Sequence, residues 1–426
     1  MNNKVAFYTL GCKLNFSETS TIAREFYENG YQKVDFNSSQ ADYYVINTCS
    51  VTENANKECR KIVRKIKNKN KNSYILITGC YAQLKPEEVK DIPGVNAVVS
   101  NANKSSIFGI INKNQDQLIC HSEIESDNFY KSFSFGERTR SFLKIQDGCD
   151  YKCTFCTIPL ARGMSRNQSI RQTIYQVKDL INKGVNEIVL TGVNIGDFGR
   201  TTNESFYDLV QELENINDDF RIRISSIEPN LLTEEIVDIV ANSTKFLPHF
   251  HIPLQSGSNK ILKLMRRRYD TNKYYKCIEY LQNIVPNVCI GADVIVGFPG
   301  ETEQDFLHTF DFIKTLNLSY LHVFSYSNRD NTKSVKMKNQ NSIEVIKKRS
   351  KTLRNYSDRI NTNFKLKQVK KDSKVLFETF NDGYLTGLSE NYIKVRVKSN
   401  KSFLNKIVPT KFIELKNEFM IGELVN

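Results

Sequence analysis

The chain has 426 residues, of which 40% are hydrophobic, so it is long enough for two or three domains with proper cores. No apolar run approaches 18 residues, which excludes a transmembrane helix, and the start MNNKVAFYTLG reads as a strand rather than a signal peptide. The net charge of +13 favours a polyanionic partner, and ten cysteines indicate metal or redox chemistry rather than a disulfide framework. We therefore expect a cytoplasmic protein with no membrane partner.

The first 120 residues alternate between short strand-like and longer helix-like segments. Apolar, β-rich runs occupy residues 5–10, 42–48, 74–79 and 97–100. Helices are expected at residues 16–29, 51–67, from Pro86 onward, where proline suits a first turn, and at 103–112. This alternation is typical of a parallel, doubly wound α/β domain, which we place at residues 1–120.

A cysteine directly follows each of the first three predicted strands, namely Cys12, Cys49 and Cys80. Because the carboxyl ends of parallel strands lie on one edge of a sheet, the three thiols should converge. Three converging thiolates predict an iron–sulfur cluster with one iron left open. The alternative, buried apolar cysteines that end strands, suits any one of them better than all three.

A second group of thiols stands in the run CDYKCTFC, at Cys149, Cys153 and Cys156. The Cx3Cx2C spacing can hold three irons of a [4Fe-4S] cluster and leave the fourth open to a small molecule. A structural zinc site usually needs a fourth ligand nearby, but the next histidine is His249. Three incidental thiols in a loop are the other alternative. We interpret the remaining cysteines as packing or surface residues: Cys59, Cys120, Cys277 and Cys289.

From residue 135 to 365 the alternation of strands and helices resumes. Six strands are expected at 140–148, 186–192, 220–226, 248–254, 289–297 and 320–327, with helices at 169–182, 233–241, 272–284 and 302–315 among the segments between them. This count predicts a six-unit parallel barrel, complete or open, with its chemistry at the carboxyl ends of the strands. His249 and His251 flank Phe250, so both should point to the same side, where we favour a barrel-interior role over metal ligation.

Positive charge is concentrated in two blocks. Residues 333–374 contain 14 Lys and Arg against 3 Asp and Glu, and residues 57–71 contain eight basic residues against Glu58 alone. These blocks predict contacts with a phosphate backbone, although solvated helix faces are the alternative. Residues 367–426 then change character and predict a β-meander with an Asp-Gly hairpin turn.

Several motifs together resemble one enzyme family. CDYKCTFC is similar to the radical S-adenosylmethionine signature, with Phe155 as its aromatic member, and GCKLN, NTC and GCYAQ resemble the methylthiotransferases. Further matches are IPLARG, LTGVNIGDFG, SSIEP, HIPLQSGS, MRRRY and DVIVGFPGET, which span nearly the whole chain. GCKLNFSET, RISSIEP and ARGMSRN look most like the branch acting on N6-threonylcarbamoyladenosine of tRNA. The branch acting on isopentenyladenosine tends to have a TSHP-type segment, and the ribosomal-protein branch GCPKN.

The resemblance implies a fold and a set of cofactors. It implies a doubly wound N-terminal α/β domain, a partial (β/α)6 radical barrel and a small C-terminal β-barrel similar to TRAM domains, which grip RNA. The Cys149, Cys153 and Cys156 cluster would bind S-adenosylmethionine and give a 5′-deoxyadenosyl radical that removes the C2 hydrogen of the adenine. The Cys12, Cys49 and Cys80 cluster, also [4Fe-4S], would present a sulfur methylated by a second S-adenosylmethionine.

The same resemblance also implies cofactor-binding residues and partners. Cofactor-binding positions are expected at Phe155, Gly192, Glu228, Gln255, Val296 and Gly297. Arg267 would pair with a carboxylate or a phosphate, or lie on the surface. The partners would be the anticodon loop of tRNA, an electron donor such as flavodoxin or ferredoxin, and a sulfur source. No acid–base catalytic side chain is identified.

Other functions remain open at this point. A related enzyme could act on isopentenyladenosine in tRNA or on a ribosomal protein side chain. A different class would be a non-catalytic iron–sulfur protein that binds RNA or carries sulfur.

Overall fold

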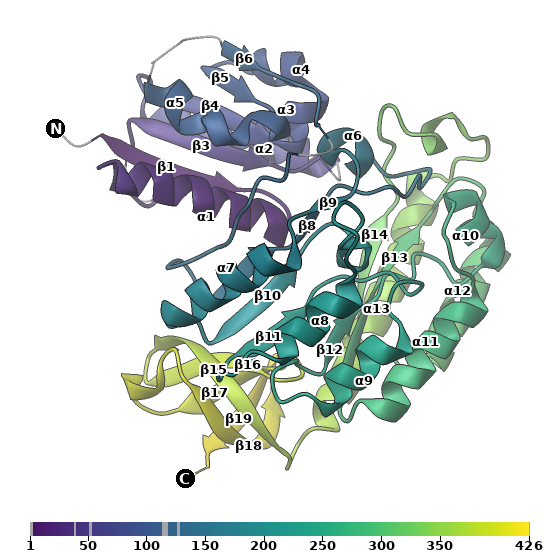
Figure 1. Ribbon diagram of the computed structural model, residues 1–426. Helices are drawn as coiled ribbons and strands as arrows, with labels where there is room; N and C mark the ends of the chain where they lie inside the picture. The colour runs from purple at the N-terminus through teal and green to yellow at the C-terminus, as the bar shows by residue number, and fades with distance from the viewer. Residues whose placement is uncertain (1–2, 38–39, 51–52, 113–117, 126–127, 426) are drawn as a thin grey trace.

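The computed structural model describes residues 3–37, 40–50, 53–112, 118–125 and 128–425. Three parts follow one another along the chain: an α/β sheet, a larger barrel with outer helices, and a small β-barrel at the opposite end (Figure 1). The start of the second predicted helix, Val51, lies outside the described residues. The domain ranges 1–120, 135–365 and 367–426 remain predictions.

The N-terminal sheet is parallel throughout. Its six strands have the order β2-β1-β3-β4-β5-β6. The four predicted strands are confirmed, whereas β2 and β6 have only two and three residues and give no clear pattern in the sequence. The strands are β1 (Lys4–Thr9), β2 (Gln32–Lys33), β3 (Tyr43–Thr48), β4 (Tyr74–Gly79), β5 (Ala97–Val99) and β6 (Leu118–Cys120).

Helices cover both faces of this sheet. Ile22 of α1 packs in one cluster with Val45, while Ile62 of α2 packs in the other with Ile46, the next residue of β3. Successive strand residues point to opposite faces, so the sheet is doubly wound as predicted. The helices are α1 (Lys13–Glu28), α2 (Glu53–Lys69), α3 (Cys80–Leu84), α4 (Pro86–Lys90), η1 (Asn101–Ser106) and α5 (Ile107–Asn112).

The central part is an open barrel of six parallel strands. Two three-stranded sheets, β11-β10-β7 and β12-β13-β14, are joined by the bridges Ile222–Phe246 and Ser226–His251. Among the described residues no pairing joins β7 to β14, so the barrel is open on that side. The strands are β7 (Arg140–Lys144), β10 (Glu187–Thr191), β11 (Arg221–Ile224), β12 (His249–His251), β13 (Cys289–Val296) and β14 (Tyr320–Ser325).

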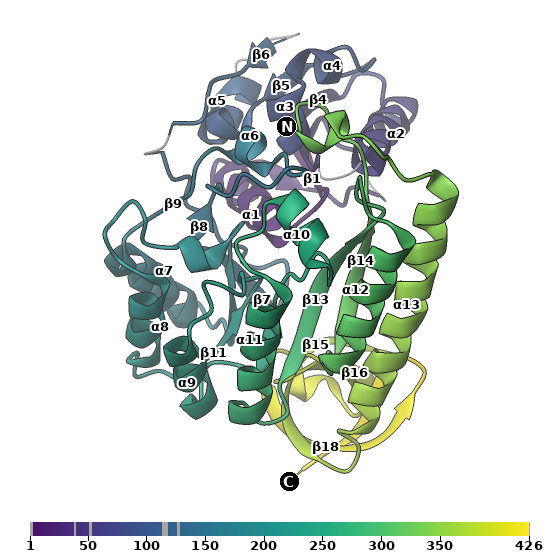
Figure 2. The same cartoon turned by 90° about the vertical axis from the view of Figure 1, so that its right-hand side faces the viewer.

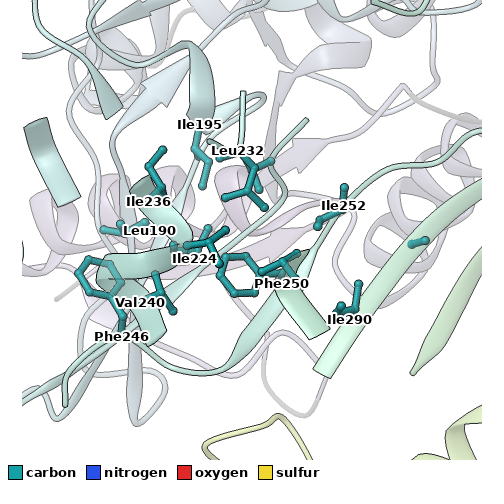
Figure 3. Close-up of a cluster of buried hydrophobic side chains, with 14 of the residues drawn as sticks. Leu190, Ile195, Ile224, Leu232, Ile236, Val240, Phe246, Phe250, Ile252 and Ile290 are labelled. Carbon is teal, nitrogen blue, oxygen red and sulfur yellow. The ribbon is translucent and has the colours of Figure 1, made fainter. Parts of the chain in front are cut away.

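Outer helices bury the apolar side of these strands. Figure 3 shows Leu190, Ile224 and Phe250 on adjacent strands packed against Ile236 and Val240 of α9, all with little or no exposure. The alternate strand positions therefore face the barrel lumen. Figure 2 shows α10–α13 along one flank. The helices are α6 (Ile158–Arg162), α7 (Ile170–Asn182), η2 (Ile195–Asp197), α8 (Phe206–Glu214), α9 (Glu234–Asn242), α10 (Asn259–Met265), α11 (Thr271–Ile284), α12 (Glu303–Thr315), η3 (Ser334–Lys336) and α13 (Ile343–Leu366).

The predicted strand at 140–148 is two strands. β7 ends at Lys144, and β8 (Gln146–Asp147) leaves the barrel and pairs antiparallel with β9 (Arg166–Asn167). The cause is a cluster of buried basic side chains that pairs with the Asp147 carboxylate at this point.

The C-terminal part is a closed five-stranded barrel of order β15-β16-β17-β19-β18. The predicted hairpin is confirmed, because Asp382 (φ 51°) and Gly383 (φ 77°) alone join the pair Asn381–Tyr384. A simple meander is wrong, since β19 runs parallel to β17 and β18 crosses to pair with β15. The elements are β15 (Asp372–Asn381), β16 (Tyr384–Ser389), β17 (Lys394–Lys398), η4 (Lys401–Phe403), β18 (Ile407–Lys416) and β19 (Phe419–Leu424).

The two basic blocks lie mainly on α2 and α13, which expose Lys61 and Lys65 on the first helix and Lys347 and Lys351 on the second. Among the described helices, none has the length and apolar character needed to cross a membrane.

We predict that Phe250→Ala destabilises the protein by about 3–5 kcal/mol, because the ring is 0% exposed and its loss leaves a cavity in the barrel core. Urea-induced unfolding measures this change. The control Leu307→Ala removes an exposed side chain from α12 and should change stability by less than about 0.5 kcal/mol. Equal effects would contradict this assignment of the core.

Candidate functional site

The structure brings Cys12, Cys49 and Cys80 to one edge of the N-terminal sheet. Gly11 has φ +102°, and a Cβ there would lie 2.7 Å from Cβ and 3.0 Å from Sγ of Cys49. Only glycine allows the Cys12 loop to pass so close to Cys49. Burial raises the pKa of Cys12, and the nearby Cys80 adds to this shift, so these two thiols are neighbours. The predicted convergence of the three thiols is therefore seen.

Side-chain amides fix the loops that carry these thiols. Asn15 Nδ2 donates to the carbonyls of Leu10 at 2.8 Å and Thr48 at 3.0 Å, which ties the Cys12 loop to the Cys49 strand. Asn101 Nδ2 donates to Cys80 Sγ at 3.7 Å and to the Ala161 carbonyl at 2.7 Å. Ala161 belongs to α6 of the barrel, so Asn101 links the two parts of the chain at the thiol site.

The second trio lies in the loop between β8 and α6. Backbone N–H groups of Tyr151 and Ile158 donate to the sulfurs of Cys149 and Cys156, each at 3.4 Å. Burial raises the pKa of Cys149 and of Cys156 to about 12, and each neighbouring thiolate adds to the effect. The two buried thiols therefore stay protonated unless a cation binds. Binding of a metal would release their protons.

The spacing of the sulfurs fits a cluster better than a single ion. Among the described residues, only His251, Asp293 and His322 form a group whose ligand atoms all lie within 4.8 Å of one another. Both cysteine trios are spread more widely than that. A single tetrahedral zinc would hold its sulfurs about 3.8 Å apart. In a [4Fe-4S] cluster each cysteine binds a different iron, so a wider spacing is expected.

Phe155, in the loop of the second trio, and two other predicted cofactor positions have features that suit a ligand site. The Phe155 ring packs edge-to-face on the ring of Phe298, with 6.2 Å between the ring centroids. Phe298 directly follows Gly297 in the chain. Gly297 has φ +79°, and its N–H donates to Glu301 at 2.6 Å. Gln255, also left-handed with φ +64°, has a buried Oε1 without a hydrogen-bond partner. Such an orphaned acceptor fits the amino group of a bound ligand like S-adenosylmethionine.

Glu228 joins the same site through Arg267. Arg267 forms an ion pair with Glu228 and donates to Cys153 Sγ at 3.2 Å. Burial raises the pKa of Glu228, and Arg267 acts against this shift. The alternative of a surface arginine is wrong, since the Arg267 side chain is 4% exposed.

The last two predicted cofactor positions, Gly192 and Val296, leave less space for a ligand. A Cβ on Gly192 would lie 2.9 Å from Gln146 Oε1, which already accepts from the N–H groups of Val193 and Asn194. Gly192 thus permits close packing on Gln146. The Val296 side chain is 0% exposed in the barrel core, and its carbonyl accepts from the Tyr326 N–H, so no side-chain contact with a ligand is available there.

A buried ion network joins α1 and η1 of the N-terminal part to β8 and α6, the segments that flank the second trio. Glu18 of α1 accepts from Arg162 at 3.0 Å and from Lys144 at 2.9 Å, and it also pairs with Lys104. Asp147 accepts a hydrogen bond from Arg162 at 3.0 Å and forms an ion pair with Lys144 at 2.6 Å. Burial alone would raise the pKa of Glu18, but the surrounding cations hold it well below its usual range.

The network carries four cations against two carboxylates once Arg166, 3.2 Å from Asp147, is included. Arg162 and Lys104 both interact with Cys80, so the excess positive charge faces the first trio. This excess of positive charge would attract the negative charge of an iron–sulfur cluster bound by three thiolates. Sequence reasoning missed the network, because its central pair, Glu18 and Arg162, lies 144 residues apart in the chain.

A further arginine fixes the loop after Cys49. Arg329, beyond β14, donates to the Ser50 hydroxyl at 3.0 Å and also to its carbonyl. Its other amino group lies 3.4 Å from Glu53 at the start of α2. Nearby, Lys85 pairs with Asp330 at 2.7 Å. The first thiol site is thus held against the barrel from both sides.

Two family profiles match the two parts of the chain that carry the thiol sites. A profile described as the radical SAM superfamily matches residues 143–313, and one described as Uncharacterized protein family UPF0004 matches residues 4–100. A solved radical S-adenosylmethionine methyltransferase from Kitasatospora setae has a TM-score of 0.57 over 79% of this chain and 77% of its own. Its sequence identity is 13%, so the likeness concerns the fold alone.

Curated relatives match over nearly the full length. A threonylcarbamoyladenosine tRNA methylthiotransferase of Bacillus subtilis is 38% identical over 99% of this chain and 96% of its own. One from Aquifex aeolicus is 36% identical over 93% and 97%. A tRNA-2-methylthio-N(6)-dimethylallyladenosine synthase of Fusobacterium nucleatum is 31% identical over 99% and 100%.

We predict that Arg162→Met lowers the free energy of unfolding by about 3–5 kcal/mol, because Glu18, Asp147 and Asn15 each lose a buried hydrogen bond to its guanidinium. The control is Arg200→Met, which removes an exposed ion pair with Asp150 and should cost less than about 1 kcal/mol. Urea-induced unfolding measures the free energy of unfolding of both variants. An equal decrease in the two would show that the buried network stabilises the protein no more than a surface ion pair does.

Proposed function

The chain belongs to the radical S-adenosylmethionine methylthiotransferase family, and we propose that it adds a methylthio group to C2 of N6-threonylcarbamoyladenosine next to the anticodon of tRNA. The observation that carries this proposal is the pair of cysteine trios. One follows three strands of the N-terminal sheet and the other lies in the loop between β8 and α6, and one ion network joins the segments beside them. The family implies S-adenosylmethionine and one [4Fe-4S] cluster.

The Cys149, Cys153 and Cys156 trio is suited to the cluster that binds S-adenosylmethionine, which supplies a 5′-deoxyadenosyl radical when bound. The chain's own groups orient that cofactor. The orphaned Gln255 Oε1 accepts a hydrogen bond, and the Glu228–Arg267 pair places charge beside Cys153. Gly297 lets the backbone approach closely at the end of β13.

A second [4Fe-4S] cluster on Cys12, Cys49 and Cys80 is part of the proposal. This cluster would provide the sulfur, with the methyl group from a second S-adenosylmethionine. Supporting observations are the close approach of Gly11 to Cys49 and the positive charge of Arg162 and Lys104 facing Cys80.

The proposed macromolecular partner is the anticodon loop of tRNA, whose adenosine is accessible to a pocket. The exposed basic faces of α2 and α13 and the small C-terminal barrel provide contacts to its backbone. A one-electron donor such as flavodoxin or ferredoxin and a separate sulfur source complete the reaction. A cytoplasmic location is part of the same proposal.

The second candidate is the same reaction on isopentenyladenosine, because a relative with the dimethylallyl substrate in its name matches the whole chain. The threonylcarbamoyladenosine relatives are more similar, at 38% and 36% identity against 31%. A ribosomal-protein target and a non-catalytic RNA-binding role have no comparable support.

We predict that the anaerobically reconstituted protein contains about eight irons per chain. The triple variant Cys12→Ala, Cys49→Ala and Cys80→Ala should contain about four and still cleave S-adenosylmethionine, but transfer no methylthio group. Alanine at Cys149, Cys153 and Cys156 should abolish the cleavage. The control Cys277→Ala should match the wild type. Unchanged iron in the first triple variant would rule out the second cluster.

Deletion of the gene should remove the 2-methylthio group from threonylcarbamoyladenosine in total tRNA and leave isopentenyladenosine derivatives unchanged. Mass spectrometry of the nucleosides measures both. Complementation with the wild-type gene should restore the modification. Loss of the methylthio group from isopentenyladenosine instead would assign the second candidate.

A further inference from the structure

The lumen of the open barrel has metal-ligating side chains on three adjacent strands. Asp293 of β13 directly follows Ala292, which packs in the core beneath the outer helices. Successive strand residues point to opposite faces, so Asp293 faces the lumen. His322 of β14 is its register partner and faces the lumen as well. His251 ends β12 and faces the same side, because Phe250 before it packs in the core.

The three side chains converge on one point. His251 Nε2 lies 2.8 Å from Asp293 Oδ1, and His322 Nδ1 lies 3.4 Å from the same oxygen. One ligand atom from each residue lies within 4.8 Å of the other two. Two ligand atoms that each lie about 2.1 Å from one metal ion are about 3.0–3.4 Å apart in octahedral or tetrahedral geometry. The spacing around Asp293 is therefore close to that of ligands on a single ion.

Tyr320 holds the other ring nitrogen of His251. A Cβ on Gly291 would lie 2.1 Å from Cζ of Tyr320, so only glycine lets this ring lie across β13. The Tyr320 hydroxyl lies 3.4 Å from His251 Nδ1 and 3.0 Å from His249 Nε2. The prediction that the two histidines point to the same side is confirmed. Metal-ligating histidines commonly have their second ring nitrogen held by such a partner, which leaves the first to face the metal.

The three side chains are accessible to an ion from the lumen. The side chains of His251, Asp293 and His322 are 12%, 22% and 57% exposed. The backbone links them to the cofactor positions, because the Gln255 N–H donates to the Asp293 carbonyl at 2.8 Å. An ion at this point would therefore lie beside the lumen positions expected to hold S-adenosylmethionine.

We propose that His251, Asp293 and His322 bind one divalent transition-metal ion, separate from both iron–sulfur clusters. Two imidazoles and one carboxylate suit zinc or ferrous iron, whereas magnesium and calcium prefer oxygen ligands throughout. Three protein ligands leave at least one position for water or for an oxygen of a bound substrate, as in catalytic metal sites. The proposal goes beyond the function above, which gives these residues no role. It also departs from the barrel-interior role without ligation that the sequence favours for His251.

The alternative is a hydrogen-bonded network in which both imidazoles donate to the carboxylate. Asp293→Asn separates the two interpretations. Its amide oxygen still accepts hydrogen bonds from the rings, but the side chain has no negative charge for a cation. The network would therefore tolerate this change, whereas a metal site would lose its anionic ligand.

The test measures zinc binding to the reconstituted holoenzyme. The oxidised protein is dialysed anaerobically against buffers of increasing zinc concentration, and zinc and iron are determined per chain. The wild type should bind one zinc at its tightest site with its iron content unchanged. X-ray absorption at the zinc edge should show imidazole nitrogen and oxygen ligands at about 2.0–2.2 Å and no sulfur at about 2.3 Å.

Asp293→Asn, His322→Asn and His251→Asn should each weaken the tightest zinc binding at least roughly 10-fold, because even the loss of an outer partner of a metal ligand typically costs that much. The matched controls are Asp311→Asn and His308→Asn on the outer helix α12, which should bind zinc as the wild type does. Iron content is measured for every variant, so that loss of a cluster is recognised.

Three results would overturn the proposal. The first is a wild type that takes up no zinc equivalent. The second is zinc binding that is unchanged in Asp293→Asn and His322→Asn. The third is sulfur in the zinc coordination shell, which would show that zinc occupies the cysteine sites instead. If Asp293→Asn fails to fold, His322→Asn decides the outcome, since this half-exposed side chain contributes little to the core.

Discussion

The structure depends on the buried ion network around Glu18 and Arg162. These residues come from the N-terminal sheet and the barrel respectively, and each is 2% exposed. Two carboxylates in such a place require several cations, and the cations come from η1, β7, α6 and β9. Because an unpaired buried charge is strongly destabilising, the network favours the arrangement of the two parts in which all of these charges are paired. In that arrangement Asn101 bridges Cys80 and Ala161 of α6, the helix that follows Cys156.

This arrangement gives a physical reason for coupling two clusters in one reaction. The sheet and the barrel both present the carboxyl ends of their parallel strands to the interface, where ligands commonly bind. α1 packs on β7 and covers part of the open barrel, with Phe16 edge-to-face on Phe142 at 5.7 Å. The lumen is closed at the other end by the C-terminal barrel, where Arg223 donates to the Ser389 and Glu390 carbonyls.

Much of the fold and of the thiol sites could be predicted from local patterns. Each long strand is an apolar run, and a cysteine after each of three strands is enough to expect convergence. The pairings between distant residues were not accessible, because Glu18 and Arg162 carry no signal of each other in the sequence. For the same reason the sequence predicts one strand at 140–148, where the structure has the two strands β7 and β8. The order of β17, β19 and β18 was missed because hairpin signals describe neighbours only, and His322 was missed because β14 reads as an ordinary strand.

The central claim is that the two clusters face one shared space, and magnetic coupling between them tests it most directly. Both clusters are reduced in the reconstituted protein, and electron paramagnetic resonance spectra are recorded for the wild type and for each triple cysteine variant. The account predicts a wild-type spectrum broadened beyond the sum of the two single-cluster spectra. A wild-type spectrum equal to that sum would show that the clusters are too far apart to act on one base.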